Sequence, residues 1–267
     1  MNDLAHGAPD LAPRNGFAAP FGVERVVAIR RPAATLVHFS TTRPAQFQFT
    51  PGHYARLGLG PDDDIVWRPY SIASAAGEAR LAFQLTLVPG GAFSGRFAKL
   101  VPGDTIRLDR RSFGFLTLAQ IAPGGTLWML ATGTGVAPFL SMLADKATWE
   151  RHDRVVLVHS VRYAAELVCG EASESTARAG IDGRRFSFVP VVTRERVPGA
   201  LDARIGELVR GGALEEAAGC RLEPASARLL LCGNPEMIRD LRALARDRGF
   251  EPGRRGVPGT LATEGYW

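Results

Sequence analysis

The stretch TLWMLATGTGVAPFLSML, Thr126–Leu143, decides the fold. It begins with an almost uninterrupted apolar run, turns at Gly133-Thr134-Gly135, and then continues into a helix predicted from about Pro138. Near-continuous apolar strands are typical of parallel sheets, because both faces of such sheets are covered by helices. The stretch therefore predicts a strand, a tight turn and a helix, the unit from which α/β domains are built.

Three further strand–helix pairs follow this unit. The expected strands are RVVLVHSV (154–161), RFSFVPVVT (185–193) and ARLLLCG (227–233), and the helices expected after them are AAELVCGEASEST (164–176), LDARIGELVRGGAL (201–214) and PEMIRDLRALARDRG (235–249). The helix of the first unit is expected over VAPFLSMLADKATWE (136–150). This alternation predicts an open parallel sheet wrapped by helices. Ligands of such domains bind beyond the carboxyl ends of the strands.

The residues before about 122 have a different texture. Short apolar runs occur at 23–29, 34–40, 54–60, 68–74, 79–88 and 104–110, and Pro- and Gly-containing turns separate them. This spacing predicts a small antiparallel barrel with one short helix near Ser94–Leu100. We therefore predict two domains, a β-barrel over 17–122 and an α/β domain with an open parallel sheet over 123–267. Residues 1–16 are expected to form a flexible arm.

Length, charge, apolar content and cysteine number exclude several classes of protein. The chain has 267 residues and no apolar run long enough for a membrane helix, so no transmembrane helix is expected. Its formal charge of +5 suits acidic partners. The N-terminus does not resemble a secretory signal. The basic residues are dispersed, which disfavours nucleic-acid binding. Three widely spaced cysteines fit neither a metal site nor a disulfide scaffold, and they favour a reducing, cytoplasmic location.

Candidate ligand-binding residues gather at the predicted strand ends of the α/β half. The Gly-Thr-Gly turn before Pro138 allows close backbone approach to a nucleotide, although it is also an ordinary strand-to-helix turn. Arg162 and Arg194 follow two strands, and Arg204 lies in LDARIGEL. Guanidinium groups there suit the 2′-phosphate that distinguishes NADP from NAD, unless they are simply solvated. Cys232 ends the last predicted strand, either as a packing residue or as the wall of a ring-binding pocket.

The barrel half contributes a second candidate site. In WRPYSIASA (67–75), Arg68 can pair with a diphosphate, Tyr70 can stack on a planar heterocycle, and Ser71 can hydrogen-bond a ring edge. In VPGGAFSGRF (88–97), Gly91 precedes Ser94, the expected N-cap of a short helix. An exposed strand and a turn would explain each stretch alone. Both together match the chemical groups of a flavin dinucleotide.

The chain resembles the ferredoxin–NADP reductase superfamily, and within it the bacterial ferredoxin/flavodoxin–NADP reductases, from about Gly16 to Trp267. RPYSIAS is similar to the family's R-x-Y-S flavin motif, and GGAFSGRF to its diphosphate motif. GTGVAPFLSML is similar to the nicotinamide loop, CGNPEMIRDL to the C-G-N-P-x-M segment, and ATEGYW to the C-terminus of a bacterial subgroup. The resemblance implies an FAD enzyme that takes hydride from NADPH and passes single electrons to a ferredoxin or flavodoxin.

The resemblance also implies individual roles. For FAD these fall on Arg68, Tyr70, Ser71, Gly91, Ser94, Tyr266 and Trp267, with His53 standing where the family often has Gln; for NADP(H) they fall on Thr134, Gly135, Arg162, Arg194, Arg204 and Cys232. Tyr70, Ser71, Cys232, Glu264 and Tyr266 are the expected catalytic residues. No metal is expected, and the protein is expected to be a monomer with an acidic electron carrier as its partner. Two alternatives remain open at this point: the reductase component of an oxygenase system, and a flavin redox sensor without turnover.

Overall fold

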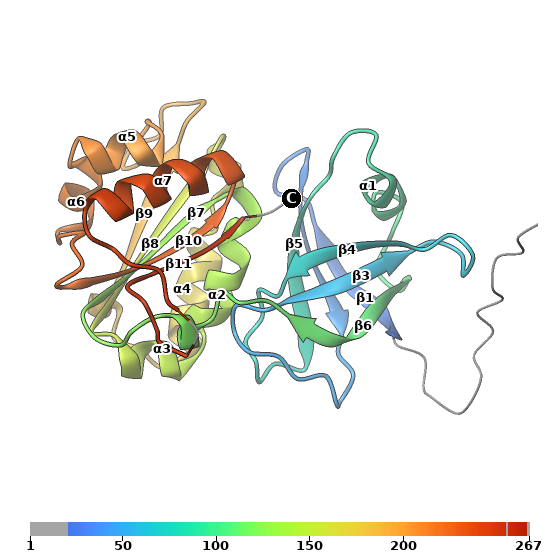
Figure 1. Ribbon diagram of the computed structural model, residues 1–267. Coiled ribbons are helices and arrows are strands. Elements are labelled where there is room, and N and C mark those ends of the chain that lie inside the picture. Colours follow the sequence, from blue (N-terminus) through green and yellow to red (C-terminus); the bar gives the residue numbers. More distant parts are fainter. Residues whose placement is uncertain (1–20, 255, 266–267) are drawn as a thin grey trace, which may run out of the picture.

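Two lobes lie side by side in the computed structural model, which describes residues 21–254 and 256–265 (Figure 1). The first lobe is an antiparallel sheet with the strand order β4-β3-β6-β1-β2-β5. Its strands are β1 (Phe21–Arg30), β2 (Leu36–Thr42), β3 (Tyr54–Leu59), β4 (Val66–Ser71), β5 (Arg80–Thr86) and β6 (Thr105–Phe113). A bridge between Ile72 and Phe83 joins the two edges of the sheet. The predicted antiparallel barrel is therefore confirmed.

Aromatic side chains fill the barrel. Phe39 lies between Phe83 and Phe97, with ring centroids 5.3 and 4.6 Å away. Phe97 belongs to α1 (Ala92–Phe97), so this helix closes one end of the barrel. Arg96 of the same helix donates a hydrogen bond of 2.7 Å to the carbonyl oxygen of Leu59. The helix that carries the predicted diphosphate motif is thereby tied to β3.

The second lobe is a parallel sheet with the strand order β11-β10-β7-β8-β9. Its strands are β7 (Thr126–Thr132), β8 (Arg154–Val161), β9 (Phe186–Val192), β10 (Ala227–Gly233) and β11 (Leu261–Gly265). Its helices are α2 (Ala137–Leu143), α3 (Lys146–Arg151), α4 (Cys169–Arg178), α5 (Ile205–Arg210), α6 (Ala213–Ala218) and α7 (Pro235–Asp247). The open parallel sheet is confirmed. β11 was not expected, and it adds a fifth strand beside β10.

Several predicted helices are divided in the structure. The helix expected over 136–150 breaks after α2, and Asp145 starts α3 by accepting a hydrogen bond of 3.0 Å from the Ala147 N–H. The helix expected over 201–214 breaks at Gly212, whose φ of 77° is left-handed. The helix expected over 164–176 begins as a single 3₁₀ turn before α4. Local caps and a left-handed glycine end these helices, although the apolar pattern continues.

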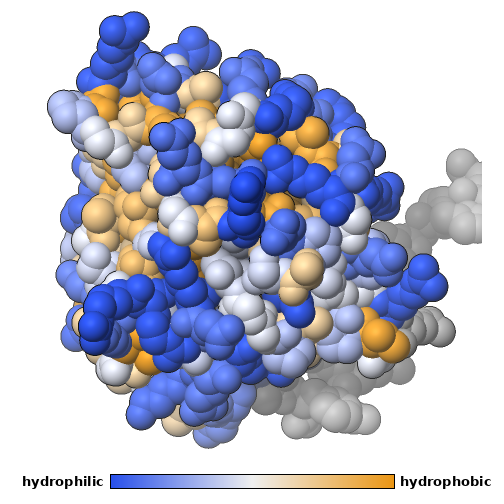
Figure 2. Space-filling model, turned by 90° about the vertical axis from the view of Figure 1, so that its left-hand side faces the viewer, coloured by the Kyte–Doolittle hydropathy of each residue, from blue (hydrophilic) through white to orange (hydrophobic). Residues whose placement is uncertain are grey.

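Helices cover both faces of the parallel sheet (Figure 1). On β8, Val156 and Val158 pack with α5, α6 and α7, whereas Val155 and Leu157 pack with α2, α3 and α4. Alternation along the strand then places the side chain of His159 on the α2/α4 face. The outer face of this lobe carries apolar patches interrupted by polar side chains (Figure 2). No helix in the described ranges is long and apolar enough to cross a membrane.

The lobes meet through ion pairs and close backbone packing. Arg30 of β1 hydrogen-bonds Glu171 of α4, and the guanidinium group of Arg178 lies 2.5 Å from a carboxylate oxygen of Glu78. A Cβ atom at Gly52, where φ is 102°, would lie 1.8 Å from the carbonyl oxygen of Leu116. Only glycine fits at that junction. The predicted arm (1–16) lies outside the described residues, and the domain boundary at 122/123 stays a prediction.

Candidate active site

The edge strand β4 presents the predicted flavin-binding residues at the barrel surface. The Arg68 side chain is exposed, and its Nη1 donates a hydrogen bond of 2.8 Å to the Trp67 carbonyl oxygen. Tyr70 is half-buried, with its ring centroid 5.1 Å from that of Phe93 in α1. Burial raises the pKa of the Tyr70 phenol, so the hydroxyl stays protonated and can donate a hydrogen bond. Ser71, the last residue of β4, is buried.

The turn before α1 combines glycine conformation with open space. Gly90 has a φ of 71°, and a Cβ atom there would meet no other atom within 4 Å. Gly91 is the N-cap of α1, so the expectation that Ser94 caps the helix is wrong. Ser94 lies inside the helix instead, where its Oγ accepts a hydrogen bond of 2.9 Å from the Val88 N–H. Its hydroxyl thereby helps to hold the shape of the turn, together with the Gly91 N–H, which donates a hydrogen bond of 3.0 Å to the Val88 carbonyl oxygen.

His53 lies at the junction of β3, β4 and β6. Its Nδ1 is 3.0 Å from the Ser112 Oγ, and its carbonyl oxygen accepts a hydrogen bond of 3.0 Å from the Ile72 N–H. Burial lowers the pKa of the imidazole, so His53 is neutral at physiological pH. Tyr54, the next residue, pairs with Ser71 in the sheet. The structure thus places His53 beside the carboxyl end of the β4 motif.

The predicted nicotinamide loop lies at the carboxyl edge of the parallel sheet. Gly133, Thr134 and Gly135 belong to the 3₁₀ helix η2 (Gly133–Val136), between β7 and α2. A Cβ atom at Gly135 would lie 2.6 Å from the Cys232 carbonyl oxygen and 2.7 Å from the Gly233 Cα. Glycine at 135 therefore allows the loop to lie directly against the end of β10.

Two further predicted residues meet at this edge. Cys232 is fully buried, and it pairs with Glu264 across β10 and β11. Burial raises the pKa of Glu264, although a hydrogen bond from the backbone of Leu116 opposes the shift. Oε2 of Glu264 is buried and has no hydrogen-bond partner among the described residues. Tyr266 and Trp267, the remaining predicted flavin contacts, lie outside the described residues.

The three predicted phosphate-binding arginines lie at neighbouring strand ends. The Arg194 N–H donates a hydrogen bond of 3.0 Å to the Arg162 carbonyl oxygen. Leu201 runs parallel to Val191, so Arg204 and Arg194 each lie three residues beyond a paired position. All three side chains are exposed, and within residues 21–254 and 256–265 none of their guanidinium groups forms an ion pair or a hydrogen bond. The carboxylates of Glu166 and Glu195 accept backbone N–H groups at this edge, so the three guanidinium groups stay available to a phosphate.

These groups fit the two cofactors that the resemblance implies. An exposed cation at Arg68, an open glycine turn at Gly90-Gly91, and the ring of Tyr70 match the diphosphate and planar ring of FAD. The arginine edge and the η2 loop match the two ends of a nicotinamide dinucleotide phosphate. Because η2 also contacts β5, the loop lies next to the barrel that carries the flavin motif. The donor sets and the glycine turns thus support both assignments.

Two residues at this edge had escaped the sequence analysis. Tyr163, directly after Arg162, exposes 51% of its surface, and an aromatic ring beside a strand-end arginine suits a purine base. His159 is 1% exposed, and its Nε2 lies 2.9 Å from the carbonyl oxygen of Gly133. Tyr163 could have been found from its position directly after Arg162. His159 could not, because a single histidine in an apolar strand gives no indication of its contacts.

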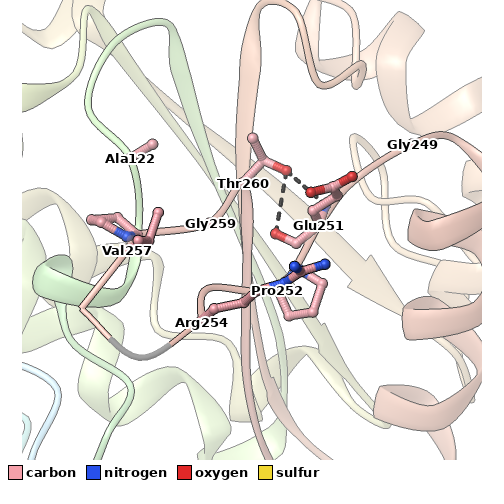
Figure 3. Close-up of a pocket in the computed structure, with 9 residues that line it drawn as sticks. Ala122, Gly249, Glu251, Pro252, Arg254, Val257, Gly259 and Thr260 are labelled. Atoms are coloured by element: carbon pink, nitrogen blue, oxygen red, sulfur yellow. Dashed lines mark hydrogen bonds between the residues drawn. The ribbon is translucent and has the colours of Figure 1, made fainter.

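A hollow of about 480 Å³ lies elsewhere, along the loop between α7 and β11 (Figure 3). Its lining includes Arg254, Val257 and Pro252, and Thr260 hydrogen-bonds Glu251 at its wall. None of the predicted cofactor-binding residues contributes to it. The predicted cofactor site is therefore identified by its donor groups and not by this hollow.

Comparison with known proteins agrees with the two-lobed architecture. Residues 28–110 match the oxidoreductase FAD-binding domain family, and residues 129–243 match the oxidoreductase NAD-binding domain family. Fold and site together therefore define a two-domain oxidoreductase that combines an FAD-binding barrel with a nicotinamide-nucleotide-binding domain.

Curated relatives and a solved structure narrow this class. The chain is 37% identical over 247 residues to ferredoxin–NADP reductase A of Sorangium cellulosum, covering 90% of this chain and 88% of that protein. It is 36% identical over 220 residues to the flavodoxin/ferredoxin–NADP reductase of Escherichia coli K12, covering 82% and 88%. The crystal structure of a ferredoxin NADP⁺ reductase from Neisseria gonorrhoeae with bound FAD and NADP aligns with a TM-score of 0.86, at 35% identity, over 94% of this chain and all of that one. The chain belongs to the ferredoxin–NADP reductase family.

The burial of His159 predicts a pH-dependent stability. Burial lowers its pKa from 6.5 to about 4, so the unfolded chain binds a proton between these values that the folded protein does not. The stability of the folded protein is therefore not reduced by this histidine above pH 6.5, and the unfolding free energy decreases as the pH falls from 6.5 towards 4. The difference in unfolding free energy between wild type and His159→Gln should change by roughly 3 kcal/mol over this interval. Chemical denaturation at several pH values measures it, and parallel profiles would contradict the assignment.

Proposed function

We propose that this protein is an FAD-dependent ferredoxin/flavodoxin–NADP reductase, which transfers electrons between NADP(H) and a one-electron carrier. The main support is the position of the nicotinamide loop. Its first residue follows β7, its glycine abuts β10, and η2 contacts the barrel that carries the β4 motif. A nicotinamide held there would lie at the boundary between the two lobes, where a flavin held by β4 also ends.

When bound, FAD supplies the redox chemistry, accepting hydride from NADPH and passing electrons on singly. The chain's part is to bind and orient. Arg68 and the Gly91 turn would hold the diphosphate, and Ser94 would keep that turn in shape. Tyr70 would pack against the ring system, and Ser71 would donate a hydrogen bond at its edge. Thr134 and Gly135 would position the nicotinamide, with Cys232 behind it.

Glu264 is the candidate proton-holding group of this site. Glu264 is half-buried and pairs with Cys232, partial burial raises the pKa of its carboxyl, and its Oε2 is buried without a hydrogen-bond partner among the described residues. A carboxyl in this state can hold a proton closer to neutral pH than an exposed one. We propose that Glu264 exchanges this proton at the reaction site. In this proposal Tyr266 would cover the flavin ring, and Trp267 would stack on either the adenine or the flavin of FAD.

The arginine edge favours NADPH over NADH. Arg162, Arg194 and Arg204 expose guanidinium groups that have no acidic partner in the described ranges, and the 2′-phosphate is the group that only NADP(H) provides. The reductase component of an NADH-dependent oxygenase would have no use for this charge. We therefore favour the NADPH-dependent reductase over the oxygenase component and over the redox sensor without turnover.

The proposed partner is an acidic ferredoxin or flavodoxin. The chain carries a net charge of +5, and exposed arginines at 68, 110 and 111 lie on the barrel near the β4 motif. Phe115, two residues beyond the end of β6, exposes 85% of its surface. Positive charge around an exposed ring suits electrostatic steering of an acidic carrier. The proposal includes a monomer in the cytoplasm, and the free thiols of Cys169 and Cys220 are in keeping with a reducing compartment.

A steady-state assay tests the proposal. Purified holoprotein is given NADPH or NADH together with ferredoxin, flavodoxin or a chemical acceptor, and acceptor reduction is followed at several salt concentrations. The expected result is preference for NADPH and carrier reduction that weakens as salt rises, because exposed charges are screened. Preference for NADH would favour the oxygenase component, and the absence of turnover with every acceptor would favour the sensor.

A further inference from the structure

His159 connects the middle of the parallel sheet to the first residue of the nicotinamide loop. It lies on β8 and pairs with Ala131 of β7 and Pro190 of β9, so its backbone is held on both sides. The imidazole is 1% exposed, and its Nε2 is 2.9 Å from the Gly133 carbonyl oxygen. A carbonyl oxygen only accepts hydrogen bonds, so Nε2 carries the proton in this contact.

The loop has few other restraints at this end. Gly133 has a φ of 51°, a left-handed conformation in which no strand ladder can continue. On the β10 side the loop is held by Gly135, packed against Cys232, and by Thr132, whose Oγ1 accepts a hydrogen bond of 2.8 Å from the Asn234 N–H. On the β8 side, His159 holds the loop through the hydrogen bond of its side chain to the Gly133 carbonyl oxygen.

We propose that His159 is a positioning residue for hydride transfer: by fixing the Gly133 carbonyl, it sets the orientation of Thr134 and Gly135 towards the nicotinamide. This inference rests on the proposed function, because it concerns the same nicotinamide site. Nδ1 of His159 is buried without a hydrogen-bond partner among the described residues, so the ring makes its hydrogen bond there through Nε2, to Gly133. A buried ring retained for packing alone would not need a donor aimed at this carbonyl.

The chain contains a matched control for this residue. His152 is 2% exposed, and its Nδ1 lies 3.2 Å from the carbonyl oxygen of Gly124, another glycine with a positive φ, of 89°. Burial lowers the pKa of this histidine too. It precedes β8, however, and so lies at the amino edge of the sheet, opposite the nicotinamide loop. Loss of either contact should lower the unfolding free energy. Only loss of the His159 contact should change the position of the bound nicotinamide and so the rate of flavin reduction.

The test compares His159→Leu, His159→Gln and His152→Leu as FAD-loaded proteins. Flavin reduction by NADPH is measured by stopped flow, together with nicotinamide–flavin charge-transfer absorbance, affinity for 2′-phospho-AMP and thermal unfolding. We expect His159→Leu to slow flavin reduction about 10- to 100-fold and to weaken the charge-transfer band, because a misplaced reactant loses rate of this order. Affinity for 2′-phospho-AMP should not change. His159→Gln, which can still donate to Gly133, should restore most of the rate, and His152→Leu should reduce at the wild-type rate.

Three results would overturn the inference: a wild-type reduction rate in His159→Leu, an equal slowing in His152→Leu, or no recovery with Gln. If His159→Leu does not fold, His159→Asn takes its place, because its amide is too short to reach Gly133 and should also reduce slowly. Failure of the proposed function gives a different result, since NADPH would then leave the flavin of the wild type oxidised.

Discussion

Replacing Arg194 with alanine is expected to raise KM for NADPH roughly 10- to 100-fold and to leave KM for NADH nearly unchanged, because a hydrogen bond to a charged group is worth about 1.5 to 3 kcal/mol. Arg194 lies between Arg162, which accepts its N–H, and the segment that leads to Arg204. Its guanidinium group has no partner in the described part of the chain, so the variant leaves no buried charge behind.

Arg196→Ala is the control for this prediction. Arg196 is exposed in the same loop and carries the same charge, but it is not among the three proposed phosphate-binding residues. Its loss should lower the long-range attraction of NADPH only slightly, since exposed charges are screened by salt. KM values for both cofactors, with wild type and both variants, decide the matter. Equal increases for NADPH and NADH in Arg194→Ala would refute the 2′-phosphate assignment.

Gly135→Ala is expected to lower kcat/KM about 100-fold for NADPH and NADH alike, because a displacement of about 1 Å at a reacting group can cost this much. The added Cβ would lie 2.6 Å from the Cys232 carbonyl oxygen and 2.7 Å from the Gly233 Cα, and backbone atoms cannot move aside cheaply. The loop must therefore shift away from β10. Overpacking of this kind also lowers the unfolding free energy by about 1 to 3 kcal/mol.

Gly183→Ala provides the control for steric change alone. A Cβ atom at Gly183 meets nothing within 4 Å, and this residue precedes β9 at the opposite end of the sheet. Its substitution should leave kinetics and stability close to those of wild type. Wild-type kinetics in Gly135→Ala would show that the loop is not placed by contact with β10. A selective loss of NADPH turnover would instead connect Gly135 to the 2′-phosphate.

The fold was predictable wherever burial alone decides structure. β8 and β10 coincide with the predicted runs RVVLVHSV and ARLLLCG, because a strand covered on both faces must be apolar throughout. β11 was missed, because LATEG lies at the sheet edge, is short and contains the polar residues Thr263 and Glu264. Helix ends were missed where a single side chain or glycine decides, as at Asp145 and Gly212.

The motifs of the site were predictable from the sequence, but the residues that hold these motifs in position were not. Arg68, Tyr70 and the glycine turns stand out in the sequence because their residue types suit a dinucleotide. The roles given to them remain predictions. His159 could not be found in this way, since its contact with Gly133 joins residues 26 positions apart. For Ser94 the sequence predicted the location but not the contact. Its hydroxyl lies at the predicted glycine turn, but it accepts a hydrogen bond from the Val88 N–H instead of capping the helix.

The central claim is that the barrel holds FAD and the α/β lobe delivers hydride to it. Anaerobic titration of the purified protein with NADPH tests this most directly, with the flavin absorbance followed after each addition and then after oxidised ferredoxin or flavodoxin is added. A yellow protein that is bleached by NADPH and regains its colour with the carrier is the predicted result. A protein that binds no FAD, or whose bound FAD stays oxidised in excess NADPH, would contradict the account.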